Sequence, residues 1–460
     1  MIYLRYLLIL LLVFTIACKS AKAPVRPAAS YEALKETEFS RINIPVSLNI
    51  QQLETALNRE MDAIFAGENQ LFGGDQQDFD LKVSKSERLT LDISPNTVAY
   101  SVPLNLTIKK DVGLANLNAD GSITLDFTTG FTIQPDWTLA TATRLSTYKW
   151  NKKPKLDLGF IRLPIESVAN RLVENSKGKI AQIIDTQIRE NFVLRDYVNE
   201  AWLKLQQPIP ASIENQLWVL MKPRSIGMTP IANKDSMINA TIVIETVAEA
   251  NIGERPVNDS IIPLPAFTPI TETQGDFKIN LFTSIPMDTL RNLVNDQVIG
   301  ETFTGGNRTV TVKDLELYGQ GNKIVVNMQL TGDYDGNIYM IGTPFYNQKK
   351  NQLEIDDLDY ELSSKNFMQK SMGWLFKKNI EKKIEAALRF PLDENLETIK
   401  KTLDESLAHY PITSGIILKG NLEDLELGET YVSESFIHVV ISSGGQLNLE
   451  LKDLAKLNEL

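Results

Sequence analysis

The sequence predicts an α+β fold of two tandem units, each a curved, mostly antiparallel sheet packed on one long helix. Three observations lead to this prediction. Runs of alternating apolar and polar residues are typical of half-buried strands. Stretches of about forty residues with apolar side chains at helical spacing are typical of long helices. The same order of strands and helix occurs twice along the chain.

The first seventeen residues have the composition of a signal peptide. Residues 1–17 form a short apolar run with one basic residue, Arg5, and end in Ala17 directly before Cys18, the only cysteine. The run is shorter than the roughly 20 apolar residues that a membrane-spanning helix needs. We expect cleavage before Cys18, lipid attachment to Cys18, and an extended, mobile, lipidated tether over residues 18–40. The alternative is an uncleaved anchor helix with an incidental cysteine.

The first unit is assigned to residues 41–260. It opens with a strand at 42–46 that runs into a helix at 50–58, and Asn49 is a suitable N-cap for that helix. Alternating strands follow, and one long helix from about 165 to 205 closes the unit. The apolar stripe of this helix consists of Val168, Leu172, Ile180, Ile184, Ile188, Phe192, Val198 and Trp202.

The second unit, residues 274–460, repeats this order. A strand at 277–281 precedes a helix that begins at Pro286, a residue suited to the first turn of a helix. After further strands, a long helix is predicted from about 367 to 407, which Pro391 should kink or break. The apolar stripe of this second helix includes Trp374, Phe376, Ile380, Ile384, Leu388, Leu396, Ile399 and Leu403.

Proline and glycine mark the connections. Residues 261–273 contain three prolines and no apolar periodicity, so they are predicted to be the linker between the units. Asp120-Gly121 and Asp335-Gly336 lie between alternating runs and are predicted to form tight hairpin turns.

Charge and cysteine content exclude several classes of protein. Without residues 1–17 the chain has 46 basic and 58 acidic residues, a net charge of −12, and no basic cluster. This charge argues against nucleic acid or anionic headgroups as main partners. Because Cys18 is the only cysteine, disulfide bonds cannot stabilise the fold and burial of apolar side chains must do so.

No catalytic motif is present, and we expect neither an enzyme, a cofactor nor a metal. The two histidines, His409 and His438, are predicted to lie at a helix end and on the solvent side of a strand. Residues 332–337 resemble the start of a calcium loop, but Ile338 replaces its glycine, so a hairpin turn is expected. Gly319-Gln320-Gly321 lacks the third glycine of a dinucleotide fingerprint and is expected to be a turn.

The two long helices are the candidate ligand-binding elements. An apolar stripe is ordinarily part of a core, but helices of about forty residues would span roughly 60 Å and could border a groove against a curved sheet. Aliphatic side chains suit acyl chains, which need contact area more than polar anchoring. The residues expected to line such a groove are Val168, Leu172, Ile180, Ile184, Ile188, Phe192, Ile380, Ile384 and Leu388.

Several local strings resemble a family of bacterial lipoproteins known as domain of unknown function 4403. They include the opening residues 44–48, the helix end at 56–58, residues 101–104, Trp137 with Trp150, and Trp202 with residues 206–208. The resemblance covers nearly the whole mature chain and implies an architecture, not an activity. More loosely, the duplicated sheet-and-helix order is similar to the tubular lipid-binding superfamily, which implies apolar ligands between sheet and helix.

Three functions remain as hypotheses. The first is a lipoprotein in the outer membrane, facing the periplasm, that binds or carries lipid or another apolar molecule. The second is a structural envelope protein whose stripes form a filled core and whose surface binds protein or glycan. The third is a hydrolase built on paired carboxylates, which are assembled in space and leave no local motif. A continuous apolar cavity favours the first, a filled interior the second, and two close carboxylates the third.

Overall fold

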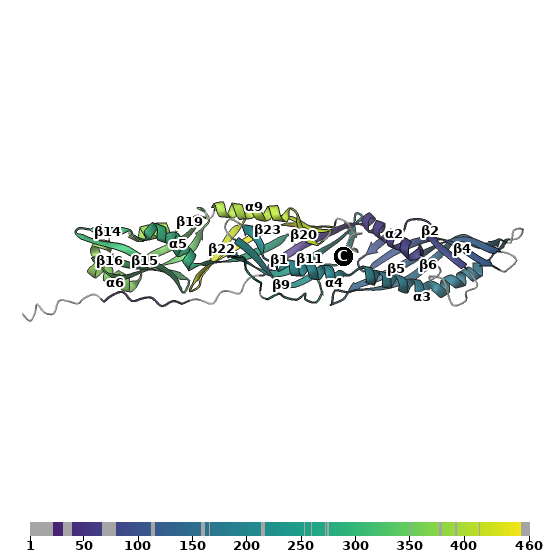
Figure 1. Ribbon diagram of the computed structural model, residues 1–460, viewed down its shortest axis with the longest axis horizontal. Helices are drawn as coiled ribbons and strands as arrows, with labels where there is room; N and C mark the ends of the chain where they lie inside the picture. Colours follow the sequence, from purple (N-terminus) through teal and green to yellow (C-terminus); the bar gives the residue numbers. More distant parts are fainter. Residues whose placement is uncertain are drawn as a thin grey trace, which may run out of the picture.

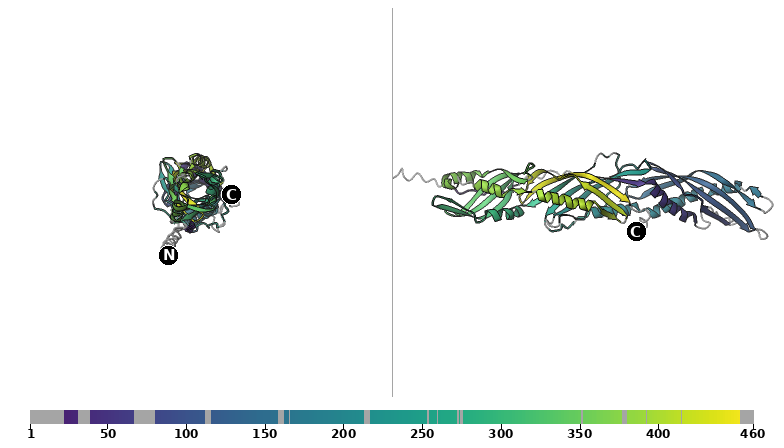
Figure 2. Two further views of the ribbon diagram at one scale, coloured as in Figure 1. Left: turned by 90° about the vertical axis from the view of Figure 1, so that its left-hand side faces the viewer. Right: turned by 90° about the horizontal axis from the view of Figure 1, so that it is seen from above.

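The computed structural model describes residues 22–30, 39–66, 80–111, 116–157, 162–164, 166–212, 217–252, 254–258, 260–271, 273, 276–350, 352–376, 380–391, 393–413 and 415–451. The predicted signal peptide and Cys18 lie outside these residues. Three sheets follow one another along an elongated molecule (Figure 1), which is narrow when viewed from its end (Figure 2). The predicted α+β class, with curved antiparallel sheets and helices along them, is confirmed.

The first end sheet comes entirely from the first half of the chain. Its strands are β2 (Asp80–Lys85), β3 (Thr90–Ser94), β4 (Thr97–Asp111), β5 (Asn116–Ile133), β6 (Leu139–Asp157) and β7 (Arg162–Pro164), all paired antiparallel. Helices α2 (Ile50–Ala66) and α3 (Glu166–Asn191) pack on this sheet. Alternate strand residues such as Leu104, Ile123 and Leu125 are fully buried and form its core with α3.

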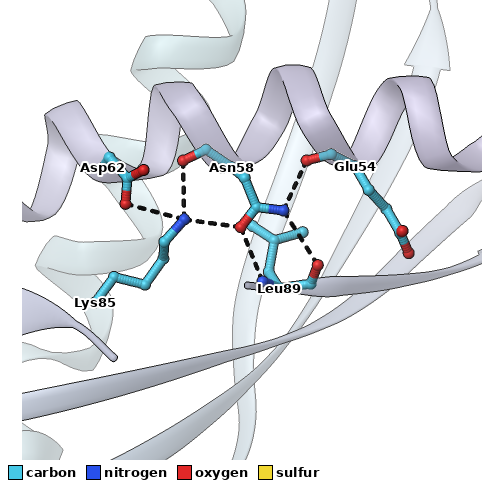
Figure 3. A network of polar contacts seen from close by, with 5 residues as sticks. All are labelled: Glu54, Asn58, Asp62, Lys85 and Leu89. Carbon is cyan, nitrogen blue, oxygen red and sulfur yellow. Dashed lines mark hydrogen bonds and ion pairs between the residues drawn. The ribbon is translucent and has the colours of Figure 1, made fainter. Parts of the chain in front are cut away.

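A polar network attaches α2 to the edge of the first end sheet (Figure 3). The buried Asn58 amide donates to the carbonyls of Glu54 (2.7 Å) and Leu89 (3.2 Å), and its Oδ1 accepts from the Leu89 N–H (2.9 Å). Lys85 Nζ donates to the same Oδ1 at 2.7 Å and pairs with Asp62 at 2.9 Å. The network satisfies polar groups that would otherwise be costly to bury.

The predicted cap of α2 is present. Asn49 caps this helix by accepting a hydrogen bond from the Gln51 N–H at 2.8 Å.

The second end sheet comes from the second half. It consists of β14 (Thr302–Gly305), β15 (Arg308–Gln320), β16 (Lys323–Gly332), β17 (Gly336–Asn347), β18 (Gln352–Tyr360) and β19 (Phe390–Pro391). The accompanying helices are α5 (Met287–Val298), α6 (Leu362–Ser371), α7 (Gly373–Phe376) and α8 (Ile380–Ala387). Buried residues of α5, α8 and the strands form one filled core.

The central sheet takes strands from both halves. From the first half come β1 (Ser40–Asn49), β8 (Ile209–Ser212), β9 (Leu217–Met228), β10 (Ala232–Lys234) and β11 (Met237–Ile252), followed by β12 (Thr268–Pro269). The second half contributes β13 (Phe277–Pro286), β20 (Tyr410–Thr413), β21 (Ile416–Leu422), β22 (Glu426–Val432) and β23 (Phe436–Leu451). The halves join where β1 and β11 pair with β13 and β1 pairs with β23. The two predicted units therefore share one sheet.

Neither long helix is continuous. The helix predicted at 165–205 is α3 followed by α4 (Leu194–Leu205), because Val193 has a non-helical backbone (φ −88°, ψ 64°). α3 packs on the first end sheet, whereas α4 packs on the central sheet and contacts β20. The helix predicted at 367–407 is divided into α6, α7, α8 and α9 (Asp393–Leu407). The predicted break at Pro391 is confirmed, since this residue pairs in β19.

One of the two predicted hairpin turns is wrong. Asp120-Gly121 lies inside β5, where the register shifts between Asp120 and Ser122. A Cβ at Gly121 would lie 3.1 Å from the Lys152 carbonyl oxygen, so this glycine serves a close strand approach at a bulge. Asp335-Gly336 does form the turn between β16 and β17, and Asp335 Oδ1 accepts from Thr331 Oγ1 at 2.6 Å.

The predicted linker is held against the body. Trp202 Nε1 donates to the Ile262 carbonyl at 2.8 Å, and Trp137 Nε1 donates to the Pro265 carbonyl at 2.7 Å. The Phe267 ring packs edge-on against Trp137, and β12 pairs with β9. The proline-rich segment is thus ordered by side chains from elsewhere in the first half.

Candidate functional site

An apolar cavity lies between the central sheet and the two helices that cover it, α4 and α9. Its floor is one face of the sheet, to which successive strands present every second residue. Ile42 and Ile44 of β1 lie opposite Ile244 and Ile242 of β11, and all four line the cavity. Strands β13 and β23 add the second half's side chains, Phe277, Ile279, Leu281, Leu447 and Leu449.

Each half of the chain contributes one helix to the walls of the cavity, and that helix contacts a strand of the other half. α4, from the first half, contacts β20 of the second half, and α9, from the second half, contacts β8 of the first. Val198 and Trp202 of α4 and Leu403 and Leu407 of α9 face the cavity. Because floor and walls both combine the two halves, the complete cavity requires both of them.

The cavity is too large and too apolar to be a packing defect. Its volume of about 350 Å³ lies within the range of roughly 300–1,000 Å³ typical of small-molecule sites. Many of its aliphatic side chains, including Ile242, Ile279 and Leu449, are only half-buried although they face the interior. Water gains few hydrogen bonds against such walls, and cavities lined in this way accept apolar ligands.

The two serine hydroxyl groups of the lining bond within the protein. Ser406 Oγ donates to the Thr402 carbonyl at 2.9 Å, and Ser443 Oγ donates to the Glu423 carbonyl at 3.2 Å. Burial raises the pKa of Tyr410 and of Tyr197 further above physiological pH, at which an ordinary phenol is already neutral. A ligand therefore meets a wall dominated by hydrocarbon.

Among the described residues that line the cavity, Lys204 is the one charged side chain. It is half-buried near the C-terminus of α4; its ammonium donates to the Pro411 carbonyl and lies 5.5 Å from the centre of the Tyr410 ring. An ammonium carries three N–H donors. The bond to Pro411 uses one donor and leaves two, and the stem of Lys204, not its ammonium, lines the cavity.

The side chains predicted to line a groove lie elsewhere. Ile180 and Ile184 are 0% and 1% exposed in the core of the first end sheet, and Ile188 packs against that core. Ile380, Ile384 and Leu388 are each 1% exposed in the core of the second end sheet. Leu172 is half-buried on α3, Phe192 is 46% exposed, and the Val168 side chain lies outside the described set. Among those whose side chains the structure describes, none borders the cavity.

The sequence did carry a signal for the residues that line this cavity. Val198, Trp202 and Leu403 belong to the predicted stripes, and they face the cavity because α4 and α9 cover the central sheet. The alternating isoleucines at 42 and 44 and at 242 and 244 carry the rest of the signal. An alternating strand is equally consistent with a filled core and with a cavity lining. Only the assembled sheet distinguishes these two possibilities.

The other sequence candidates have structural roles. His438, predicted to face solvent, is half-buried: Nδ1 bonds Ser284 Oγ (2.9 Å) and Nε2 bonds Ser433 Oγ (3.0 Å). Burial lowers the pKa of His438. His409 is exposed two residues beyond α9. Within the part of the chain that the structure describes, no three His, Cys, Asp or Glu side chains form a possible metal site, and no helix is both long and apolar enough to cross a membrane.

Fold and cavity define an elongated α+β protein with two end sheets and an apolar cavity in a central sheet that both halves build. The chain belongs to the family described as domain of unknown function (DUF4403), whose model matches residues 38–451. A search of curated proteins found no match. A crystal structure of lipopolysaccharide binding protein aligns over 90% of this chain and 99% of its own, at 10% identity and a TM-score of 0.28.

Proposed function

We propose that this protein binds the acyl chain of a lipid with an anionic headgroup in the central cavity. The observation that carries the proposal is the cavity itself, an unfilled apolar space between two filled end-sheet cores. Each methylene removed from water contributes about 0.8 kcal/mol. A chain of about a dozen methylenes would therefore gain on the order of 10 kcal/mol before the costs of association.

Lys204 supports an anionic headgroup over a neutral one. Its stem lines the cavity and its ammonium bonds the Pro411 carbonyl. An uncharged headgroup that reaches the ammonium would leave its remaining donors to water. A carboxylate or phosphate would accept one or two charge-assisted hydrogen bonds there. The proposal is thus for a binding protein, not an enzyme.

The test is a titration of the full mature chain with palmitate and with hexadecanol, which differ only in the headgroup. We expect both to bind. Lys204→Gln should weaken palmitate binding about tenfold, because a charge-assisted hydrogen bond contributes roughly 1.5 kcal/mol, and should change hexadecanol binding little. Lys179→Gln, at an exposed position of α3, is the matched control. Native mass spectrometry of the gently purified protein should show co-purifying lipid.

Two results would contradict this proposal in different ways. Equal weakening of both ligands by Lys204→Gln would make Lys204 a structural link between α4 and Pro411 and remove the headgroup assignment. Absence of binding for either ligand, together with no co-purifying lipid, would sink the lipid-binding function and favour a structural envelope protein that binds protein or glycan.

We further propose that the protein is held to the outer membrane, facing the periplasm, by lipid on Cys18. The support is the apolar run of residues 1–17 that ends one residue before the only cysteine. Multiple acyl chains on one cysteine give stable anchoring, whereas a single chain is marginal. Cys18→Ser should yield a folded protein that no longer sediments with membranes. Retention of this variant on membranes at high salt would mean that another feature anchors the chain.

A further inference from the structure

Residues 22–30, here called the strap, lie along the outer face of the second end sheet, contrary to the expected mobile tether. Arg26 makes two bonds to the Glu316 carboxylate, at 2.9 and 2.8 Å, and its guanidinium lies 4.8 Å from the centre of the Tyr318 ring. Tyr318 Oη donates to the Pro27 carbonyl at 3.0 Å. A bidentate pair that also stacks on an aromatic ring is more specific than a simple surface ion pair.

The strap is also attached at Ser30 and at Val25. At one end, the Ser30 N–H donates to the Gly319 carbonyl at 3.2 Å, and the Gly321 N–H donates to the Ser30 carbonyl at 3.0 Å. Toward the N-terminus, the Val25 N–H donates to Ser363 Oγ at 3.0 Å, at the start of α6. The strap is therefore held by backbone and side-chain bonds from Val25 to Ser30.

The outer face beneath the strap has its own apolar cluster. Tyr318, Val325 and Tyr339 alternate along β15, β16 and β17 with residues of the inner core, so they face outward, yet they are only 0–5% exposed. Burial raises the pKa of Tyr318 to about 12. The hydrogen bond from Arg26 lowers the pKa of Glu316, which keeps the carboxylate ionised and the pair intact at neutral pH.

The contacts define the direction in which the chain leaves the sheet. Ser30 lies at Gln320, Pro27 at Tyr318 and Arg26 at Glu316, so the strap runs parallel to β15. The Gln320 end of β15 adjoins the central sheet, where the Gly319 N–H donates to the Glu434 carbonyl at 3.0 Å. Followed toward the N-terminus, the strap therefore runs away from the central sheet to the outer end of the second end sheet (Figure 1).

We infer that the strap fixes the orientation of the molecule on a lipid membrane, with the outer end of the second end sheet toward the bilayer and the first end sheet away from it. This inference rests on the proposed lipid anchor at Cys18. Seven residues of chain from Val25, which is bonded to Ser363, to Cys18 reach at most about 25 Å. A free tether from Cys18 to Phe39 would reach roughly 75 Å and would impose no orientation.

The test measures energy transfer from a labelled cysteine to acceptor lipids in phosphatidylglycerol-containing vesicles that carry the lipidated full-length protein. Lipid on Cys18 blocks its thiol, so an added cysteine is the one reactive site. Asn307→Cys labels the exposed turn after β14, at the outer end of the second end sheet, and Asn118→Cys labels β5 near the opposite end. We expect strong transfer from position 307 and several-fold weaker transfer from position 118.

Breaking the strap should remove this difference. Arg26→Glu places two carboxylates at the Glu316 contact, and the transfer efficiencies of the two labels should become similar while the protein stays on the vesicles. Lys349→Glu, the same charge change at an exposed position, should leave the difference intact. Similar transfer from both labels in the unaltered protein would overturn the orientation but not the anchor. Failure of the unaltered protein to stay on the vesicles would overturn both.

Discussion

Ile279→Trp should reduce lipid uptake by at least about tenfold and leave the protein folded. Ile279 lies on β13 in the floor of the cavity and is half-buried there, so the indole can occupy space that a ligand would use. Displacing as few as two methylenes removes roughly 1.6 kcal/mol of burial, which is more than a tenfold change in affinity. Titration with a fluorescent fatty acid measures the uptake, and thermal melting measures the stability.

The neighbouring residue provides the control. Lys278 lies on the same strand but is exposed on the opposite face of the sheet. Lys278→Trp adds the same side chain at nearly the same point of the chain and should leave uptake unchanged. If Ile279→Trp bound lipid as well as the unaltered protein, the ligand site would have to lie outside the central cavity.

Ile184→Asn should be strongly destabilising, by about 3–5 kcal/mol. Ile184 is 1% exposed on α3 and packs in the first end sheet's core, where an amide finds neither water nor space. Ile242→Asn, at a half-buried position facing the cavity, should cost distinctly less because its amide can reach the unfilled space. Urea unfolding of the two variants, followed by the same probe, provides the comparison.

The two substitutions separate a filled core from a ligand site within one protein. Ile184→Asn protein that remains folded at low temperature should still bind lipid, because the end-sheet core is not part of the cavity. A small loss of stability for Ile184→Asn, accompanied by a clear loss of uptake, would place the ligand between α3 and the first end sheet, as the sequence suggested.

Local features were readable in advance because their causes are local. Alternation of apolar residues identified the strands, helical spacing identified the helices, and their repeated order identified the duplication. Pro391 removes a backbone donor and clashes with the preceding turn, so its break was predictable. Gly121 was misassigned because an Asp-Gly pair suits a hairpin turn and a bulge equally; the close approach of the Lys152 carbonyl decided between them.

The sequence by itself determined the α+β class, the duplicated order of elements and the family resemblance, because each depends on short-range spacing or local strings. Only the tertiary structure decided that both halves build one central sheet, that the long helices divide, and that the cavity lies under α4 and α9. The pairings of β1 with β13 and β23 join residues more than two hundred positions apart.

The same apolar side chains occur in a filled core and in the lining of a cavity. Whether Ile44 or Ile184 faces empty space depends on what the assembled chain places opposite each of them.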